Sequence, residues 1–99
     1  MKPAIARIQA AVCRHYSLPP EVLIGPSRAR HIARSRQVGM YLAQRFTVLS
    51  YPEIGRRFGG RHHSTAIHAV RRIAALRAAN PEINADIIAI TASIMERAR

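Results

Sequence analysis

The sequence of 99 residues is poor in acidic side chains, aromatic side chains and cysteine: it has five Asp and Glu residues in total, no Trp and one Cys. So few carboxylates argue against a two-carboxylate catalytic pair or a calcium site. A single cysteine, Cys13, cannot form an internal disulfide or a zinc site built on cysteines. No apolar run approaches the roughly 20 residues of a membrane-spanning helix, so we expect no membrane partner.

Arginine is what the sequence has in abundance. Lys and Arg total 16 against five acids, the formal net charge is +11, and Lys2 is the one lysine. Most of this charge lies in residues 21–79, whereas the last 20 residues set Glu82, Asp86 and Glu96 against Arg97 and Arg99. Because such a charge opposes folding by self-repulsion, it predicts a polyanionic partner. We interpret the middle of the chain as an anion-binding centre and the C-terminal segment as a structural brace.

The apolar residues recur with helical spacing along the whole chain, and no window alternates as a strand would. We therefore predict an all-α fold, a compact bundle of about six helices in a single domain over residues 1–99. The expected helices run from about Pro3 to His15, Pro19 or Pro20 to Ile24, His31 to Phe46, Tyr51 to Phe58, His62 or His63 to Ala79, and Glu82 to Arg97. The expected core comprises Ile5, Ile8, Val12, Ile32, Val38, Leu42, Phe46, Ile54, Phe58, Ile67, Val70, Ile73, Ala74, Leu76, Ile83, Ile87, Ile90 and Ile94.

A short helix, a glycine turn and a longer helix follow one another in the second half of the chain. Ser50 with Glu53 three residues later matches a capping box that opens the short helix. Gly59-Gly60 closes it, and the longer helix begins with Arg61-His62-His63-Ser64-Thr65. This is the shape of a helix-turn-helix, in which the second helix enters the major groove N-terminus first. Together with the positive charge, it predicts double-stranded DNA as the partner.

Three motifs in this order resemble a known family. They are Phe58-Gly59-Gly60-Arg61-His62-His63-Ser64-Thr65-Ala66-Ile67-His68-Ala69, the basic stretch Ser27-Arg28-Ala29-Arg30-His31-Ile32-Ala33-Arg34-Ser35-Arg36-Gln37, and Ser50-Tyr51-Pro52-Glu53-Ile54-Gly55. They resemble the C-terminal DNA-binding domain (domain IV) of the bacterial chromosomal replication initiator DnaA, over most of the chain. The resemblance implies an all-helical module distantly like the Trp repressor. It also implies binding to boxes similar to TTATnCACA in replication origins, and a role in replication initiation or its regulation.

The resemblance also implies roles for individual residues. The major-groove readers of the family map onto His62, His63, Ser64 and Thr65, and its minor-groove arginine maps onto Arg28. Phosphate contacts map near Arg36, Gln44, Tyr51, Pro52 and Arg61, and Arg30 and Arg34 belong to the same basic motif. An arginine on a basic loop suits the negative potential of a narrow, A·T-rich minor groove.

Two positions depart from the family pattern. His62 stands where the family has Asp, and Gln44 stands where it has a lysine. A carboxylate accepts a hydrogen bond from the N4 amine of cytosine, whereas a neutral histidine can donate to an acceptor of guanine. We therefore expect the preferred DNA site to differ from the family box.

Several alternatives stay open at this stage. No G-x-x-x-x-G-K-[ST] motif is present, so we expect either a free-standing relative of the DNA-binding domain or an excised domain. Met1 and an expected helix from Pro3 favour the free-standing protein. A transcriptional regulator or a less specific nucleic-acid binder with an altered site is the alternative function. We expect no enzyme, no cofactor and no metal, because the five histidines lack paired carboxylates, and we expect a cytoplasmic, nucleoid-associated location with protein partners undefined.

Overall fold

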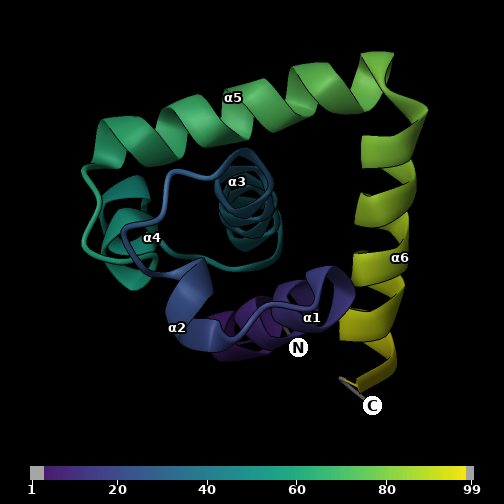
Figure 1. Cartoon of the computed structure of the whole chain (residues 1–99), viewed down its shortest axis with the longest axis horizontal. Coiled ribbons are helices and arrows are strands. Elements are labelled where there is room, and N and C mark those ends of the chain that lie inside the picture. Colours follow the sequence, from purple (N-terminus) through teal and green to yellow (C-terminus); the bar gives the residue numbers. More distant parts are fainter. Residues whose placement is uncertain (1–3, 98–99) are drawn as a thin grey trace.

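The computed structural model describes residues 4–97, and all regular structure in this range is helical, which confirms the all-α prediction. Figure 1 shows the arrangement of the helices. They are α1 (Ile5–Tyr16), α2 (Pro20–Leu23), α3 (Arg30–Phe46), α4 (Tyr51–Arg57), α5 (His63–Ala79) and α6 (Pro81–Arg97).

Helix α3 is the centre of the fold. Helix α5 crosses it and also packs on α4, while α1 packs on the opposite side of α3 and α6 joins α5 to α1 (Figure 1). The largest fully buried side chains come from every helix and from the turn after α4; they are Phe58, Ile8, Leu23, Met40, Leu42, Ile54, Ile73, Ile87, Ile90, Ile94, Val12 and Val38. One continuous core therefore holds all six described helices together.

The helix ends follow local capping chemistry. The Ser50 hydroxyl accepts a hydrogen bond from the backbone N–H of Glu53 at 3.4 Å, which confirms the Ser50 half of the predicted capping box, while the Glu53 carboxylate pairs with Arg56 and Arg57. The side-chain oxygen of Asn80 accepts from the N–H groups of Glu82 and Ile83 at 2.9 and 3.2 Å. Because Asn80 caps the helix and Pro81 suits its first turn, α6 begins one residue earlier than predicted.

The buried face of α5 differs in part from the prediction. Ala66, Ala69 and Ile73 are buried, whereas Ala74 is exposed. Residue 74 lies about 100° around the helix from residue 73, so it points away once the 66/69/73 line faces α3 and α4. The prediction for Ala74 is therefore wrong. Six other expected core residues are only half-buried: Ile32, Phe46, Ile67, Val70, Leu76 and Ile83.

Polar contacts tie α6 to α1. Asp86 accepts a hydrogen bond from the Tyr16 hydroxyl at 2.9 Å, and its other oxygen lies 3.0 Å from Nε2 of His15. Arg14 donates to the Ser93 hydroxyl at 3.0 Å. Burial, and then the bond to Asp86, raise the pKa of Tyr16 above its ordinary value. Helix α6 thus uses an acid from the C-terminal segment to brace the N-terminal helix.

Candidate nucleic-acid interface

Helices α4 and α5 are joined by a tight turn over residues 58–62. The Arg61 N–H donates to the Gly55 carbonyl at 2.8 Å, and the Gly60 N–H donates to the Arg56 carbonyl at 3.1 Å. Gly59 and Gly60 have φ angles of +92° and +70°, a region that favours glycine. A Cβ atom on Gly59 would also lie 2.1 Å from the Ile24 carbonyl oxygen. The turn therefore contacts the backbone of the α2–α3 loop (residues 24–29) directly.

The four predicted major-groove readers lie together at the start of α5. His62 is the N-cap, and its Nδ1 accepts from the backbone N–H of Ser64 at 3.2 Å. The Ser64 hydroxyl lies 2.9 Å from the same Nδ1, and the His63 ring centroid lies 4.1 Å from that of His62. All four side chains, His62 to Thr65, are exposed. They offer donors and acceptors to any partner that approaches the end of α5.

The cap fixes which nitrogen of His62 carries the proton. A ring nitrogen that accepts a hydrogen bond has no proton in the neutral imidazole, so the proton is on Nε2. The exposed edge of the neutral ring is therefore a donor. An Asp at the same cap would present only acceptors.

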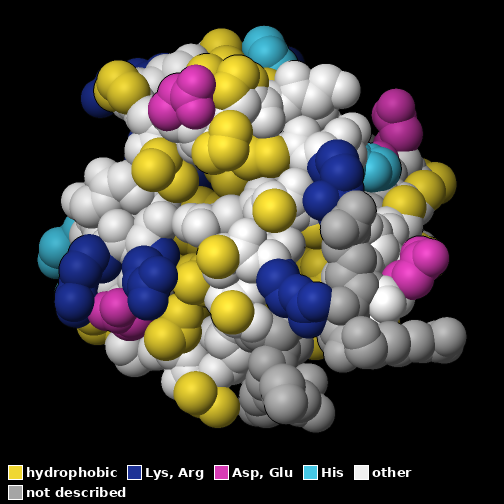
Figure 2. Space-filling view, turned by 90° about the horizontal axis from the view of Figure 1, so that it is seen from below, with side chains coloured by type: hydrophobic (Ala, Val, Ile, Leu, Met, Phe, Trp, Pro, Cys, Tyr) yellow, Lys and Arg dark blue, Asp and Glu magenta, His cyan; other side chains and the backbone are white. Residues whose placement is uncertain are grey.

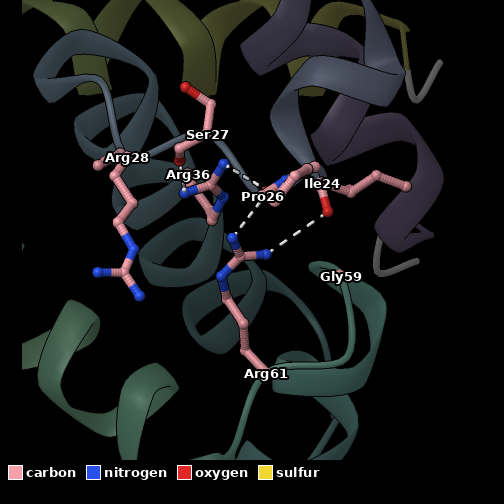
Figure 3. A pocket seen from close by; sticks show the side chains of 9 residues that line it. Ile24, Pro26, Ser27, Arg28, Arg36, Gly59 and Arg61 are labelled. Carbon is pink, nitrogen blue, oxygen red and sulfur yellow. Dashed lines mark hydrogen bonds between the residues drawn. The ribbon is translucent and has the colours of Figure 1, made fainter.

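Two arginines from different elements hold the α2–α3 loop by its carbonyl groups (Figure 3). Arg36 of α3 donates to the carbonyls of Leu23 at 2.8 Å, Gly25 at 3.0 Å and Ser27 at 3.2 Å. Arg61 donates to the carbonyls of Gly25 at 2.8 Å, Ile24 at 3.5 Å and Phe58. The Gly25 carbonyl is thus shared by both guanidinium groups.

These two guanidinium groups are partly removed from water. Burial lowers the pKa of both Arg36 and Arg61, and the nearby charge of Arg61 lowers that of Arg36 further. Arg36 and Arg61 donate to backbone carbonyls, and neither guanidinium pairs with a carboxylate among the described side chains.

Arg28 lies on the same loop, beside this pair. It lines an open pocket of about 550 Å³ together with Pro26, Arg36, Gly59 and Arg61. Figure 3 shows its side chain extending away from the loop, with its guanidinium on no dashed line. The structure thus brings the predicted minor-groove arginine next to the turn that leads into α5.

The other predicted contact residues are dispersed. Arg30, Gln44 and Pro52 are exposed and Tyr51 is half-buried. Arg36, expected near a phosphate, is 6 % exposed, and three carbonyls occupy its donors. Arg34 is also partly buried: its Nη1 is enclosed without a hydrogen-bond partner, and its charge acts on Tyr16 of α1. The basic motif therefore divides into exposed and inward-facing arginines.

Gln37 and His68 were not among the predicted site residues. They line a small pocket of about 130 Å³ between α3 and α5, which Arg61 and Thr65 also line. Gln37 ends the basic motif, so its place in that motif was the signal available in the sequence. Both side chains belong to the surface beside the first turns of α5.

The face seen in Figure 2 has a different character, because its basic side chains are separated by hydrophobic, neutral and acidic ones. On α4, Glu53 pairs with Arg56 at 3.0 Å and with Arg57 at 3.4 Å. Both arginines of α4 are thus partly neutralised, unlike Arg28 on the α2–α3 loop.

The described residues offer neither a membrane span nor a metal site. No described helix is long and apolar enough to cross a membrane. The described residues contain no group of three His, Cys, Asp or Glu side chains that could hold a metal ion.

The chain is similar to known proteins over most of its length. Residues 5–73 match the family described as the bacterial dnaA protein helix-turn-helix. The chain is 57 % identical to the chromosomal replication initiator protein DnaA of Sphingopyxis alaskensis over 90 residues, which are 91 % of this chain and 20 % of that protein. It is 50 % identical to that of Cereibacter sphaeroides over 86 residues, 87 % of this chain and 19 % of the relative. For that of Caulobacter sp. (strain K31) the identity is 51 % over 84 residues, 85 % of this chain and 17 % of the relative.

The chain therefore spans about a fifth of the length of these curated relatives. The match covers α1 to α4 and the part of α5 that carries the exposed first turn. The resemblance inferred from the three motifs is thereby confirmed, and this chain belongs to the family of the bacterial DnaA protein helix-turn-helix.

Proposed function

We propose that this chain binds double-stranded DNA sequence-specifically, at sites related to the TTATnCACA box. In this proposal the first turn of α5 enters the major groove and Arg28 enters the adjacent minor groove. The observation that carries it is the cluster of exposed side chains from His62 to Thr65, with the Arg28 loop held beside them.

The first turn of α5 has the chemistry to read base edges. Ser64 and Thr65 can donate to or accept from a base or a phosphate, and the Thr65 methyl group suits the methyl group of thymine. The positive end of the helix dipole at the start of α5 favours an approaching phosphate. Arg28 provides a guanidinium that fits an A·T-rich minor groove, where the potential is most negative.

In this proposal, the phosphate contacts are made by the residues of the predicted set that are at least partly exposed and have donors or surface available. We assign them to Arg30, Gln44, Pro52, Tyr51 and Arg61. Arg61 uses its Nη1 and Nη2 atoms for the bonds to backbone carbonyls, which leaves its Nε for a phosphate. Arg36 receives a positioning role instead, because its donors are already bound to carbonyls. Arg34 is left without a direct contact, since it is partly buried and acts on Tyr16.

The relatives support a role in DNA replication. They are chromosomal replication initiator proteins, and this chain corresponds to about a fifth of their length. We infer that it supplies DNA recognition in replication initiation or its regulation, in the nucleoid of a bacterial cytoplasm and without a catalytic role of its own. Regulation of transcription from an altered site is the second candidate, which the replacement of the family Asp by His62 favours.

Binding should be measured on a box duplex, a scrambled duplex and an RNA duplex over a range of salt concentrations. With about five to seven cationic side chains contacting phosphate, log K should fall against log[salt] with a slope of about −5 to −6. Arg28→Ala should weaken binding more when the flank of the box is A·T-rich than when it is G·C-rich. A flat salt response would exclude duplex DNA as the partner, and equal affinity for box and scrambled duplexes would exclude sequence-specific binding.

A further inference from the structure

The α2–α3 loop is bonded on one side to α3, through Arg36, and on the other to the turn before α5, through Arg61 (Figure 3). Both bonds converge on the Gly25 carbonyl, at 3.0 and 2.8 Å. The Gly59 backbone also approaches Ile24 so closely that no side chain fits between them. The loop therefore cannot shift without breaking contacts to the helix-turn-helix.

Stability alone gives little reason for this arrangement. Two like charges lie near each other, partly buried, and neither has a carboxylate partner among the described residues. Removing such charges from water is costly, and local conflicts of this kind are expected where function overrides stability. The geometry also requires arginine, because a lysine ammonium cannot spread its donors over the separated carbonyls of Leu23, Gly25 and Ser27.

We propose that Arg36 and Arg61 are positioning residues that couple the two DNA-reading elements. They fix the Arg28 loop relative to the first turn of α5, so that reading of the minor groove by Arg28 depends on Arg36. This inference rests on the proposed function. Arg36 is the residue to test, because it is 6 % exposed and any effect of its replacement on DNA recognition is indirect.

The test compares Arg36→Lys with a matched control, Arg77→Lys. Arg77 is also a partly buried arginine. It donates to the side-chain oxygen of Asn84 at 2.7 Å and to the Tyr41 hydroxyl at 3.1 Å, and neither partner belongs to the α2–α3 loop. Dissociation constants are measured at one salt concentration on two box duplexes, one with an A·T-rich and one with a G·C-rich flank. A third duplex, with an altered box core, reports reading by α5.

We expect the wild type to prefer the A·T-rich flank by about tenfold, the scale of one well-made contact. Arg28→Ala should abolish that preference. Arg36→Lys should reduce it to about twofold or less while keeping discrimination of the box core, and Arg77→Lys should keep both. In the double variant Arg28→Ala/Arg36→Lys, the flank preference should be no lower than in Arg28→Ala alone, since both changes act through one contact.

Three results would overturn the coupling. In the first, the Arg36→Lys protein keeps the full flank preference, and in the second it loses affinity equally on every duplex. In the third, the double variant loses as much flank preference as the sum of the losses in the two single variants. If Arg36→Lys does not melt cooperatively, Pro26→Gly loosens the exposed loop while both arginines stay. It should lower the flank preference in the same direction, and an unchanged preference would contradict the inference. Failure of the proposed function looks different, because the wild type itself would then not distinguish box from scrambled duplex.

Discussion

Position 62 offers a direct test of base reading, because two substitutions of nearly equal shape can separate donor from acceptor. The side-chain oxygen of Asn or Asp can replace Nδ1 of His62 as the acceptor for the Ser64 N–H, 3.2 Å away. Loss of an N-cap costs about 1 kcal/mol, so His62→Asn and His62→Asp should both keep that stability. The Asn amide then retains an outward donor, as His62 does, whereas Asp presents only acceptors.

The size of the expected change follows from this difference. One well-made contact discriminates between bases by about 1–3 kcal/mol. We expect wild type and His62→Asn to prefer a base pair that presents an acceptor such as guanine O6 or N7, and His62→Asp to prefer the cytosine amine. The new carboxylate also opposes binding to any duplex, by about 0.6 kcal/mol for one phosphate about 7 Å away at the dielectric constant of water.

Selection of bound duplexes from a randomised pool, followed by dissociation constants on the selected sites, measures both effects. All three proteins are compared at one salt concentration, after thermal melting has established that they are equally folded. A G·C pair presents both the guanine acceptors and the cytosine amine, so the strand that carries the guanine must also be compared. If His62→Asn and His62→Asp select the same base pair in the same strand orientation and with equal discrimination, residue 62 reads no base, and the reasoning from the proton on Nε2 is refuted. Wild type that already prefers the family box, with no change in His62→Asp, would refute the expected change of site.

Two further predictions concern stability. The raised pKa of Tyr16 means that the unfolded chain releases this proton at lower pH than the folded protein, so the free energy of unfolding should fall by about 1 kcal/mol between pH 10 and pH 11. Tyr16→Phe, which removes the titrating hydroxyl bonded to Asp86, should lose less stability over that interval in urea unfolding, and equal losses would contradict the assignment. Gly59→Ala should destabilise more than Gly60→Ala: both have positive φ, costing about 1–2 kcal/mol, but a Cβ at Gly60 meets no atom within 4 Å. Equal melting temperatures of the two variants would show that the contact with Ile24 yields without cost.

Local signals in the sequence were sufficient for most of the helix boundaries. The Ser50 cap, the Asn80-Pro81 stop and the glycines after α4 act through nearby backbone groups, so their effect can be read without knowledge of the fold. The buried face of α6 was equally clear, since Ile87, Ile90 and Ile94 are large apolar residues that recur on one side of the helix. Alanine carries less information, because it suits both buried and exposed helix positions, and this is why Ala74 was placed wrongly.

The sequence could not predict which arginines are exposed and which bond to the loop. Arg28, Arg30, Arg34 and Arg36 follow one another in a single basic motif and look alike as residue types. Only tertiary contacts separate them: the carbonyls of the α2–α3 loop take up the donors of Arg36, while Arg28 stays exposed on the same loop. The candidate readers at the start of α5 could be named in advance because one helix end brings them together. The loop that lies beside them depends on pairs up to 37 residues apart.

The hydrogen bonds from Arg36 and Arg61 to the α2–α3 loop also determine how the sequence of this loop can vary. Its bonds go to backbone carbonyls, which every residue type provides, so they constrain the path of the chain and not the identity of the side chains. Exposed positions such as Ile24 and Ala29 are thus free to change during evolution as long as the loop length is kept. For protein engineering, the exposed side chains of the loop can therefore be replaced. Arg36 and Arg61 lie outside the loop and keep its backbone in position.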